Sequence, residues 1–138
     1  MNKKDQILKF VIVAIVIFII VNNFILSPGN ILSWDVFGYY LYLPLKFIYN
    51  DLGLKDSSII DGILEKYHNT ATFYQAMKMP DGNFVMKYSM GLSFFYAPFF
   101  FIGHIIAKVF NYTADGFSLP YQYSIFIGGI IYFLIGIW

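Results

Sequence analysis

The sequence contains no cysteine and no arginine, and it carries little charge of either sign. Charged side chains make up 12% of its 138 residues, against 59% hydrophobic and 22% aromatic residues. Soluble domains contain about 25% charged residues, so this composition is typical of a membrane protein. The absence of cysteine excludes a disulfide framework and a thiolate metal site. A net charge of +1, with no basic patch, excludes nucleic acid as a partner.

Three apolar runs predict three transmembrane helices, at about residues 7–26, 90–109 and 121–138. Twenty helical residues rise about 30 Å, which is the thickness of the hydrocarbon core of a bilayer. A signal peptide is the alternative for the first run, but the run is long for one and lacks a cleavage motif, so we expect a retained anchor. The third run stops without a basic flank, so we expect the N-terminal part of a longer protein.

The lysines near the N-terminus predict the orientation of the chain. Lys3, Lys4 and Lys9 lie at the start of the first run, and the positive-inside rule places that end in the cytoplasm. Residues 27–89 then form an exoplasmic loop, and residues 110–119 a short cytoplasmic loop. The glycosylation sequon in the short loop is therefore discounted.

The long loop is expected to contain short elements at the membrane surface. An amphipathic helix is predicted from Asp35, with a kink at its proline. Its apolar positions recur at offsets of three and four and are Phe37, Tyr40, Leu41, Pro44, Leu45 and Ile48. A second short helix is predicted to start at residues 58–61, which have the Ser-x-x-acid form. Residues 72–78 and 84–88 flank a group of turn formers and predict a small β-hairpin. The fold class is thus an all-α membrane protein with one hairpin outside the bilayer.

Two charged residues in this loop have both a structural and a functional interpretation. Asp35 is a lone carboxylate in an aromatic stretch, so it is either a helix N-cap, worth about 1 kcal/mol, or a catalytic group. The two roles are compatible, because a capped carboxylate is also held in one orientation. Lys87 precedes the second run, where it is either an anchor with its ammonium in water or a cation that meets phosphate. For Lys87 alone, the anchor is favoured.

The order of these features resembles that of the GT-C glycosyltransferases, multi-spanning enzymes that use polyprenyl-phosphate sugars. The resemblance rests on one span, then Trp34-Asp35, then amphipathic elements, then Lys87-Tyr88-Ser89-Met90 before the second span. The sequence is most similar to the bacterial protein mannosyltransferases and the aminoarabinose transferases. Their motif at the second position is often Lys/His-Pro-Pro-Leu, and both prolines are absent here. Val36 stands where the family often has a second acid.

The resemblance implies a place, partners and site residues. It implies the N-terminal part of a multi-spanning GT-C fold in the cytoplasmic (inner) membrane, inactive without the remaining helices of the protein. Asp35 is then the catalytic residue, and we assign Lys87, Tyr88 and Tyr39 to substrate binding. The expected partners are membrane lipid and a polyprenyl-phosphate sugar donor. No cofactor is indicated, and because Val36 replaces the second acid, a paired-acid metal site is not expected; a divalent metal stays open.

The expected function is transfer of a sugar from a polyprenyl-phosphate donor to an acceptor hydroxyl or lipid at the outer face of the membrane. Asp35 would accept the proton of the acceptor, and Lys87 would stabilise the departing phosphate. The alternative is a non-catalytic membrane protein, either a transporter fragment or an assembly subunit, in which Asp35 only caps its helix. Transporters place polar groups near the bilayer midplane, and the predicted spans are nearly free of them, which favours the transferase.

Overall fold

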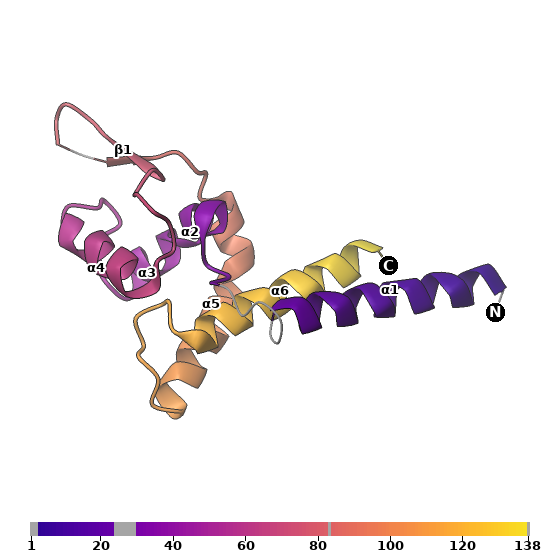
Figure 1. Ribbon diagram of the computed structural model, residues 1–138. Helices are drawn as coiled ribbons and strands as arrows, with labels where there is room; N and C mark the ends of the chain where they lie inside the picture. Colours follow the sequence, from indigo (N-terminus) through magenta and orange to yellow (C-terminus); the bar gives the residue numbers. More distant parts are fainter. Residues whose placement is uncertain (1–2, 24–29, 83, 138) are drawn as a thin grey trace.

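The computed structural model describes residues 3–23, 30–82 and 84–137, and within them it is mainly helical (Figure 1). The elements in chain order are α1 (Lys3–Val21), α2 (Trp34–Tyr40), α3 (Tyr42–Phe47), α4 (Ser57–Tyr67), β1 (Ala76–Lys78), β2 (Phe84–Met86), α5 (Gly91–Val109) and α6 (Leu119–Ile137). The helices α2, α3 and α4 and the hairpin gather at one end, while α1 and α6 extend away from them together. In this view α1 reaches further from that end than α6 does.

Two helices, α5 and α6, are long and apolar enough to cross a membrane, which supports membrane association of the chain. The apolar part of α1, Gln6–Val21, is shorter. Apolar side chains lie on every side of α1 and are exposed, as at Phe10 (74%) and Phe18 (67%). A helix that is apolar all round needs either protein or lipid around it. The predicted end of the first span, at about residue 26, lies outside the described residues.

Glycines allow α5 and α6 to pack closely. A Cβ atom at Gly103 would lie 2.9 Å from the Cα of Tyr121, and one at Gly128 would lie 2.4 Å from the ring of Phe99. The Tyr132 hydroxyl donates to the Phe95 carbonyl at 3.0 Å. Because residues early in α6 meet residues late in α5, the two helices are antiparallel. Small residues at such a contact let two apolar helices approach without a clash.

The helix predicted from Asp35 is two helices, α2 and α3, separated at Leu41. Pro44 has no N–H with which to bond the Tyr40 carbonyl, so the helical ladder is interrupted there, as the predicted kink requires. The second predicted helix is α4, but its N-cap is Asp56, whose carboxylate accepts from the Ser58 N–H at 2.9 Å. The Ser-x-x-acid pattern therefore predicted this helix correctly and its cap wrongly.

The predicted hairpin is present and is shorter than expected. β1 and β2 pair antiparallel, with Met77 opposite Val85. Gly82 has a φ of +89°, and its N–H donates to the Met79 carbonyl at 2.9 Å, which closes the turn that the sequence predicted. Each strand has three residues, so the sheet is small.

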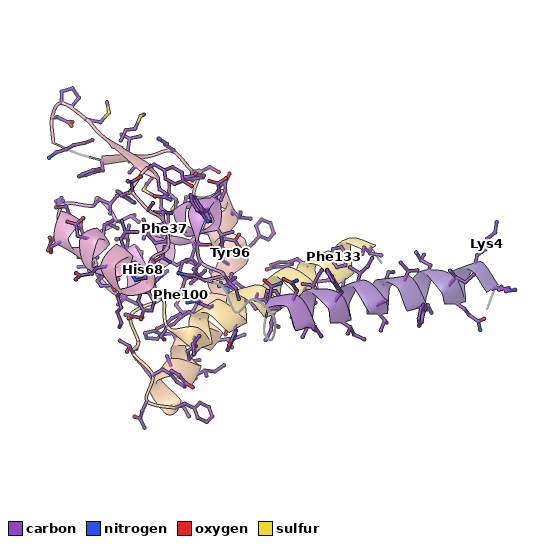
Figure 2. All side chains as sticks on the ribbon, viewed as in Figure 1. Lys4, Phe37, His68, Tyr96, Phe100 and Phe133 are labelled. Carbon is purple, nitrogen blue, oxygen red and sulfur yellow. The ribbon has the colours of Figure 1, made fainter. Side chains whose placement is uncertain are left out.

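The core is aromatic and brings together segments that the sequence placed apart. Phe37 and Tyr40 of α2 are fully buried beside Phe100 of α5 and Phe117 (Figure 2). Phe37 and Tyr40 lie in the segment that was predicted to be an amphipathic helix at the membrane surface, and both are core residues. Phe117 belongs to the segment predicted to lie in the cytoplasm, yet its ring lies 5.8 Å from that of Tyr67 in the long loop. The prediction that these two loops lie on opposite sides of a membrane is inconsistent with these contacts.

Candidate functional site

Asp35 lies in the first turn of α2, and its exposed carboxylate is held by two tyrosines. The Tyr88 hydroxyl donates to Oδ1 at 2.6 Å, and the Tyr74 hydroxyl donates to the same oxygen at 3.1 Å. The N-cap of α2 is Ser33, which precedes Trp34, and its side chain makes no capping hydrogen bond. The interpretation of Asp35 as the helix cap is therefore wrong. Its carboxylate is oriented by side chains from other parts of the loop.

The start of α2 is fixed by buried amides that lie beneath it. Trp34 has a φ of +53°, its N–H donates to the Asn69 carbonyl at 3.1 Å, and its carbonyl accepts from Gln75 Nε2 at 3.2 Å. Asn69 and Gln75 are almost completely buried. Backbone polar groups without water need such partners, so these bonds hold the segment 69–75 under the helix. That position brings Tyr74 to Asp35.

Tyr88 reaches Asp35 by passing over a glycine. A Cβ atom at Gly38 would lie 2.3 Å from Cδ2 of the Tyr88 ring, so only glycine leaves room for it. The Tyr42 hydroxyl donates to the Tyr88 carbonyl at 2.5 Å, and the Tyr39 ring meets the Tyr88 ring edge-on at 4.7 Å. The hydrogen bond to Asp35 raises the pKa of Tyr88 well above its ordinary value. Tyr88 therefore stays a donor across the neutral range.

Lys87 joins this group through Tyr74. Its ammonium lies 5.7 Å from the centroid of the Tyr74 ring, within reach of a cation–π contact. Its backbone N–H donates to the Gln75 carbonyl at 2.8 Å, so its position is fixed by the continuation of the hairpin. The ammonium and the Asp35 carboxylate thus contact the same tyrosine, one at its ring and the other at its hydroxyl.

The four residues singled out from the sequence, Asp35, Lys87, Tyr88 and Tyr39, lie in one cluster, and Tyr74 completes it. Tyr74 was not among the predicted site residues, although the strand register of the predicted hairpin indicates its position. The register that pairs Ala76 with Met86 continues to place residue 75 opposite 87 and residue 74 opposite 88. The strand pairing therefore brings the two tyrosines to the same carboxylate.

An apolar groove of about 310 Å³ begins beside this cluster. Its walls come from α1, α2, α5 and α6 and include Val16, Ile19, Val36, Tyr96, Ile130 and Phe133. Val36 is the residue after Asp35, so the groove comes near the cluster, although the side chains of Asp35, Tyr74, Lys87 and Tyr88 do not line it. Figure 2 shows Tyr96 where the helix pair meets the rest of the molecule and Phe133 further along that pair. The groove suits an extended apolar ligand.

A second carboxylate, Asp115, lies away from the cluster and acts as a structural tie. Oδ2 accepts from the ammonium of Lys66 at 2.9 Å and from the Tyr67 hydroxyl, while Oδ1 accepts from the backbone N–H groups of Phe117 and Ser118. Burial alone would raise the pKa of Asp115, but the hydrogen bonds from Lys66, Tyr67 and Phe117 outweigh it and lower that pKa. Burial of the Tyr67 hydroxyl and its hydrogen bond to Asp115 raise the pKa of Tyr67 to about 12. Because both oxygens are occupied, Asp115 connects α4 to the segment after α5.

The Asp35 cluster offers an exposed carboxylate, an ammonium and two hydroxyl donors near an apolar groove. Such a set can accept a proton and bind an anion in the same place. Within the described ranges, no group of three histidine or acidic side chains lies together in the way a metal site needs. No protein-family model, no curated protein and no solved structure matches the chain.

Proposed function

We propose that the chain is part of a membrane glycosyltransferase of the GT-C type, which transfers a sugar from a polyprenyl-phosphate donor to an acceptor hydroxyl. The observation that carries the proposal is the position of Asp35. Its carboxylate is exposed and oriented by Tyr74 and Tyr88, and the next residue, Val36, lines an apolar groove. An exposed acid that is held in one orientation can accept a proton from a bound acceptor.

The groove and the ammonium fit the two parts of such a donor. A polyprenyl tail is a long, flexible hydrocarbon chain, and the groove beside Val36 offers it an apolar wall within the helix pair. The phosphate at its head is an anion that a lysine ammonium binds as a point charge. Lys87 and Asp35 both contact Tyr74, so the proposal places the phosphate at Lys87 and the sugar between the two charged groups.

The proposed reaction is an inverting displacement. The acceptor hydroxyl oxygen attacks the anomeric carbon, and the bond from that carbon to the phosphate oxygen breaks with its electron pair on the phosphate. Asp35 takes the proton of the hydroxyl, through Oδ2, since both tyrosine bonds end on Oδ1. Lys87 stabilises the charge that develops on the phosphate. General-base assistance of this kind is worth roughly 10²–10⁴-fold in rate.

The test compares Asp35→Asn with Asp61→Asn in membranes that contain the protein, using radiolabelled polyprenyl-phosphate sugars as donors. Asp61 is an exposed acid on α4 away from the cluster, so its variant controls for loss of a surface charge. We expect Asp35→Asn to lower transfer by roughly 10²–10⁴-fold and Asp61→Asn to leave it unchanged. Equal transfer by wild type and Asp35→Asn would reject the proposal. Absence of transfer by the wild type with every donor would favour the non-catalytic alternative.

A further inference from the structure

The segment between α5 and α6 is bound to the long loop by polar contacts at several points. Lys66 of α4 forms a salt bridge with Asp115 at 2.9 Å, and the Tyr49 hydroxyl donates to the Asp115 carbonyl at 3.0 Å. The Tyr40 hydroxyl donates to the Gly116 carbonyl at 2.5 Å. Segments on opposite sides of a bilayer are about 30 Å apart, so hydrogen bonds cannot join them. Both segments must therefore lie on one side of any membrane that the chain crosses.

The position of α5 is consistent with this conclusion. Its 19 residues are about 28 Å long, enough to cross a bilayer. Yet the ring of Tyr40, which bonds to Gly116, also lies 6.4 Å from the Tyr96 ring and 6.0 Å from the Phe100 ring, in the first half and at the middle of α5. The chain thus leaves the end of α5 and returns to the level of its middle. A helix that is followed in this way does not separate two compartments.

The side chains of α5 divide into two faces. Ser93, Phe100, Gly103 and Ala107, at helical spacing, are buried against the neighbouring elements. The opposite face carries exposed apolar side chains, including Ile105 at 61%. An exposed apolar face of this kind is suited to contact with lipid.

The helix pair α1 and α6 has the opposite character. The described side chains of α6 from 131 to 137 are all exposed, while its buried residues lie between Pro120 and Gly128. This second half of α6 extends beside α1, away from the globular end (Figure 1). The apolar side chains of α1 are exposed along its length as well. Both segments are largely apolar on every side, and such helices need lipid or protein around them.

We propose that α1 crosses the bilayer and that α5 does not, so that the long loop and the segment between α5 and α6 both lie on the outer side. The partner of the exposed apolar surface is the lipid bilayer. The lysines Lys3, Lys4 and Lys9 are at the opposite end of α1, where the positive-inside rule places the cytoplasm. The inference concerns topology and holds whether or not the protein transfers sugars.

Because the sequence contains no cysteine, single-cysteine variants report topology without background. Gln6→Cys, Asp61→Cys and Thr113→Cys place the thiol at the start of α1, on α4 and between α5 and α6, all at exposed positions. Intact cells are treated with a membrane-impermeant maleimide, and detergent-treated samples show that each thiol is reactive. We expect Asp61→Cys and Thr113→Cys to be labelled alike in intact cells and Gln6→Cys to be protected.

Two results would overturn the proposal. Protection of Thr113→Cys together with labelling of Asp61→Cys would show that α5 crosses the membrane. Labelling of Gln6→Cys to the same extent as the other two would show that α1 does not cross. The detergent-treated samples distinguish a protected thiol from one that is unreactive in a misfolded chain, since full labelling in detergent is required of all three variants.

Discussion

Gly38 is the residue on which the contact between Tyr88 and Asp35 depends. Its missing side chain leaves room for the Tyr88 ring, because a Cβ atom would lie 2.3 Å from that ring. In Gly38→Ala the ring must move, and its hydrogen bond to Asp35 is lost. A hydrogen bond to a charged group is worth about 1.5–3 kcal/mol, so we expect kcat for transfer to fall by about ten- to a hundredfold.

The control for Gly38→Ala is Gly62→Ala on α4, where an added Cβ atom would have nothing within 4 Å. Both are glycine-to-alanine changes in helices, so their difference isolates the clash with Tyr88. Steady-state assays of the two variants, with thermal unfolding measured alongside, separate a local change from loss of fold. If the two variants transferred sugar equally well, Tyr88 would have no part in orienting Asp35.

Asp115 gives a prediction about pH. Its pKa is lowered in the folded protein, so its contribution to stability is complete above the ordinary value of about 4 and is lost as the pH falls through the lower folded value. The pKa of its partner Lys66 is raised, so that contribution persists until the pH exceeds the ordinary lysine value. We expect Asp115→Asn to lower the unfolding free energy at pH 7 by about 1–3 kcal/mol.

Thermal unfolding in detergent from pH 7 to pH 3 measures this effect. The difference between wild type and Asp115→Asn should narrow below about pH 4, where the wild-type carboxylate itself becomes protonated. Asp61→Asn, which removes an exposed acid on the same side of the molecule, should show no such difference. If the difference in unfolding free energy between wild type and Asp115→Asn stayed constant down to pH 3, the charge of the Asp115 carboxylate would not contribute to holding α4 against this segment.

At the scale of residues, the sequence was sufficient to single out Asp35 and Lys87, because a charge among aromatic residues is conspicuous. It assigned Asp35 to the wrong structural role, since a cap is decided by backbone angles one or two residues away. Tyr74 resembled any strand tyrosine, because its part in the cluster depends on the register of the hairpin. Asp115 was indistinguishable from a turn residue, because its partners Lys66 and Tyr67 lie almost fifty positions earlier.

At the scale of elements, the contact between α5 and α6 depends on Gly103. A Cβ atom there would meet the Cα of Tyr121 at 2.9 Å and the Pro120 carbonyl oxygen at 3.1 Å, both of which are backbone atoms. Backbone cannot turn aside as a side chain can, so Gly103→Ala must separate the helices. Overpacking of this kind costs about 1–3 kcal/mol, and we expect a lower unfolding temperature in detergent.

Gly129→Ala, on α6, is the matched control, because an added Cβ atom there would have nothing within 4 Å. It should leave the unfolding temperature unchanged or raise it slightly, since alanine favours the helix. A similar unfolding temperature for Gly103→Ala and Gly129→Ala would mean that α5 and α6 do not pack as closely as the structure has them.

The sequence predicted which elements exist better than where they end. Periodicity predicted a helix from Asp35, but the interruption at Leu41 depends on the missing N–H of Pro44. The β-hairpin was predicted from its turn residues, yet each strand has only three residues, and beyond them the Lys87 N–H donates to the Gln75 carbonyl. Element boundaries follow from such tertiary contacts, which a local pattern does not contain.

At the scale of the whole molecule, hydropathy predicted the approximate bounds of α5 and α6 but not whether lipid or protein surrounds them. A helix that faces lipid and a helix that packs against another helix both need an apolar sequence, and α5 packs against protein on one face. The burial of Phe117 against Phe37 and Tyr40 was not readable from the short loop that contains it. The prediction that this loop and the long loop lie on opposite sides of a membrane is therefore inconsistent with these contacts, although the three apolar runs are almost entirely helical in their described parts.

A lysine placed at an exposed apolar position distinguishes a helix in the bilayer from one on its surface. Val13, near the middle of α1, and Ile102, near the middle of α5, are 55% and 48% exposed. At the centre of a span a lysine costs about 2.5–3.5 kcal/mol, whereas on a surface helix its ammonium reaches water along its own stem. Val13→Lys should therefore reduce the fraction of protein that resists alkaline extraction from membranes, and Ile102→Lys should not. An equal loss for both variants would place the middle of α5 in hydrocarbon, where it would have to cross the membrane despite the contacts that join the loops at its two ends.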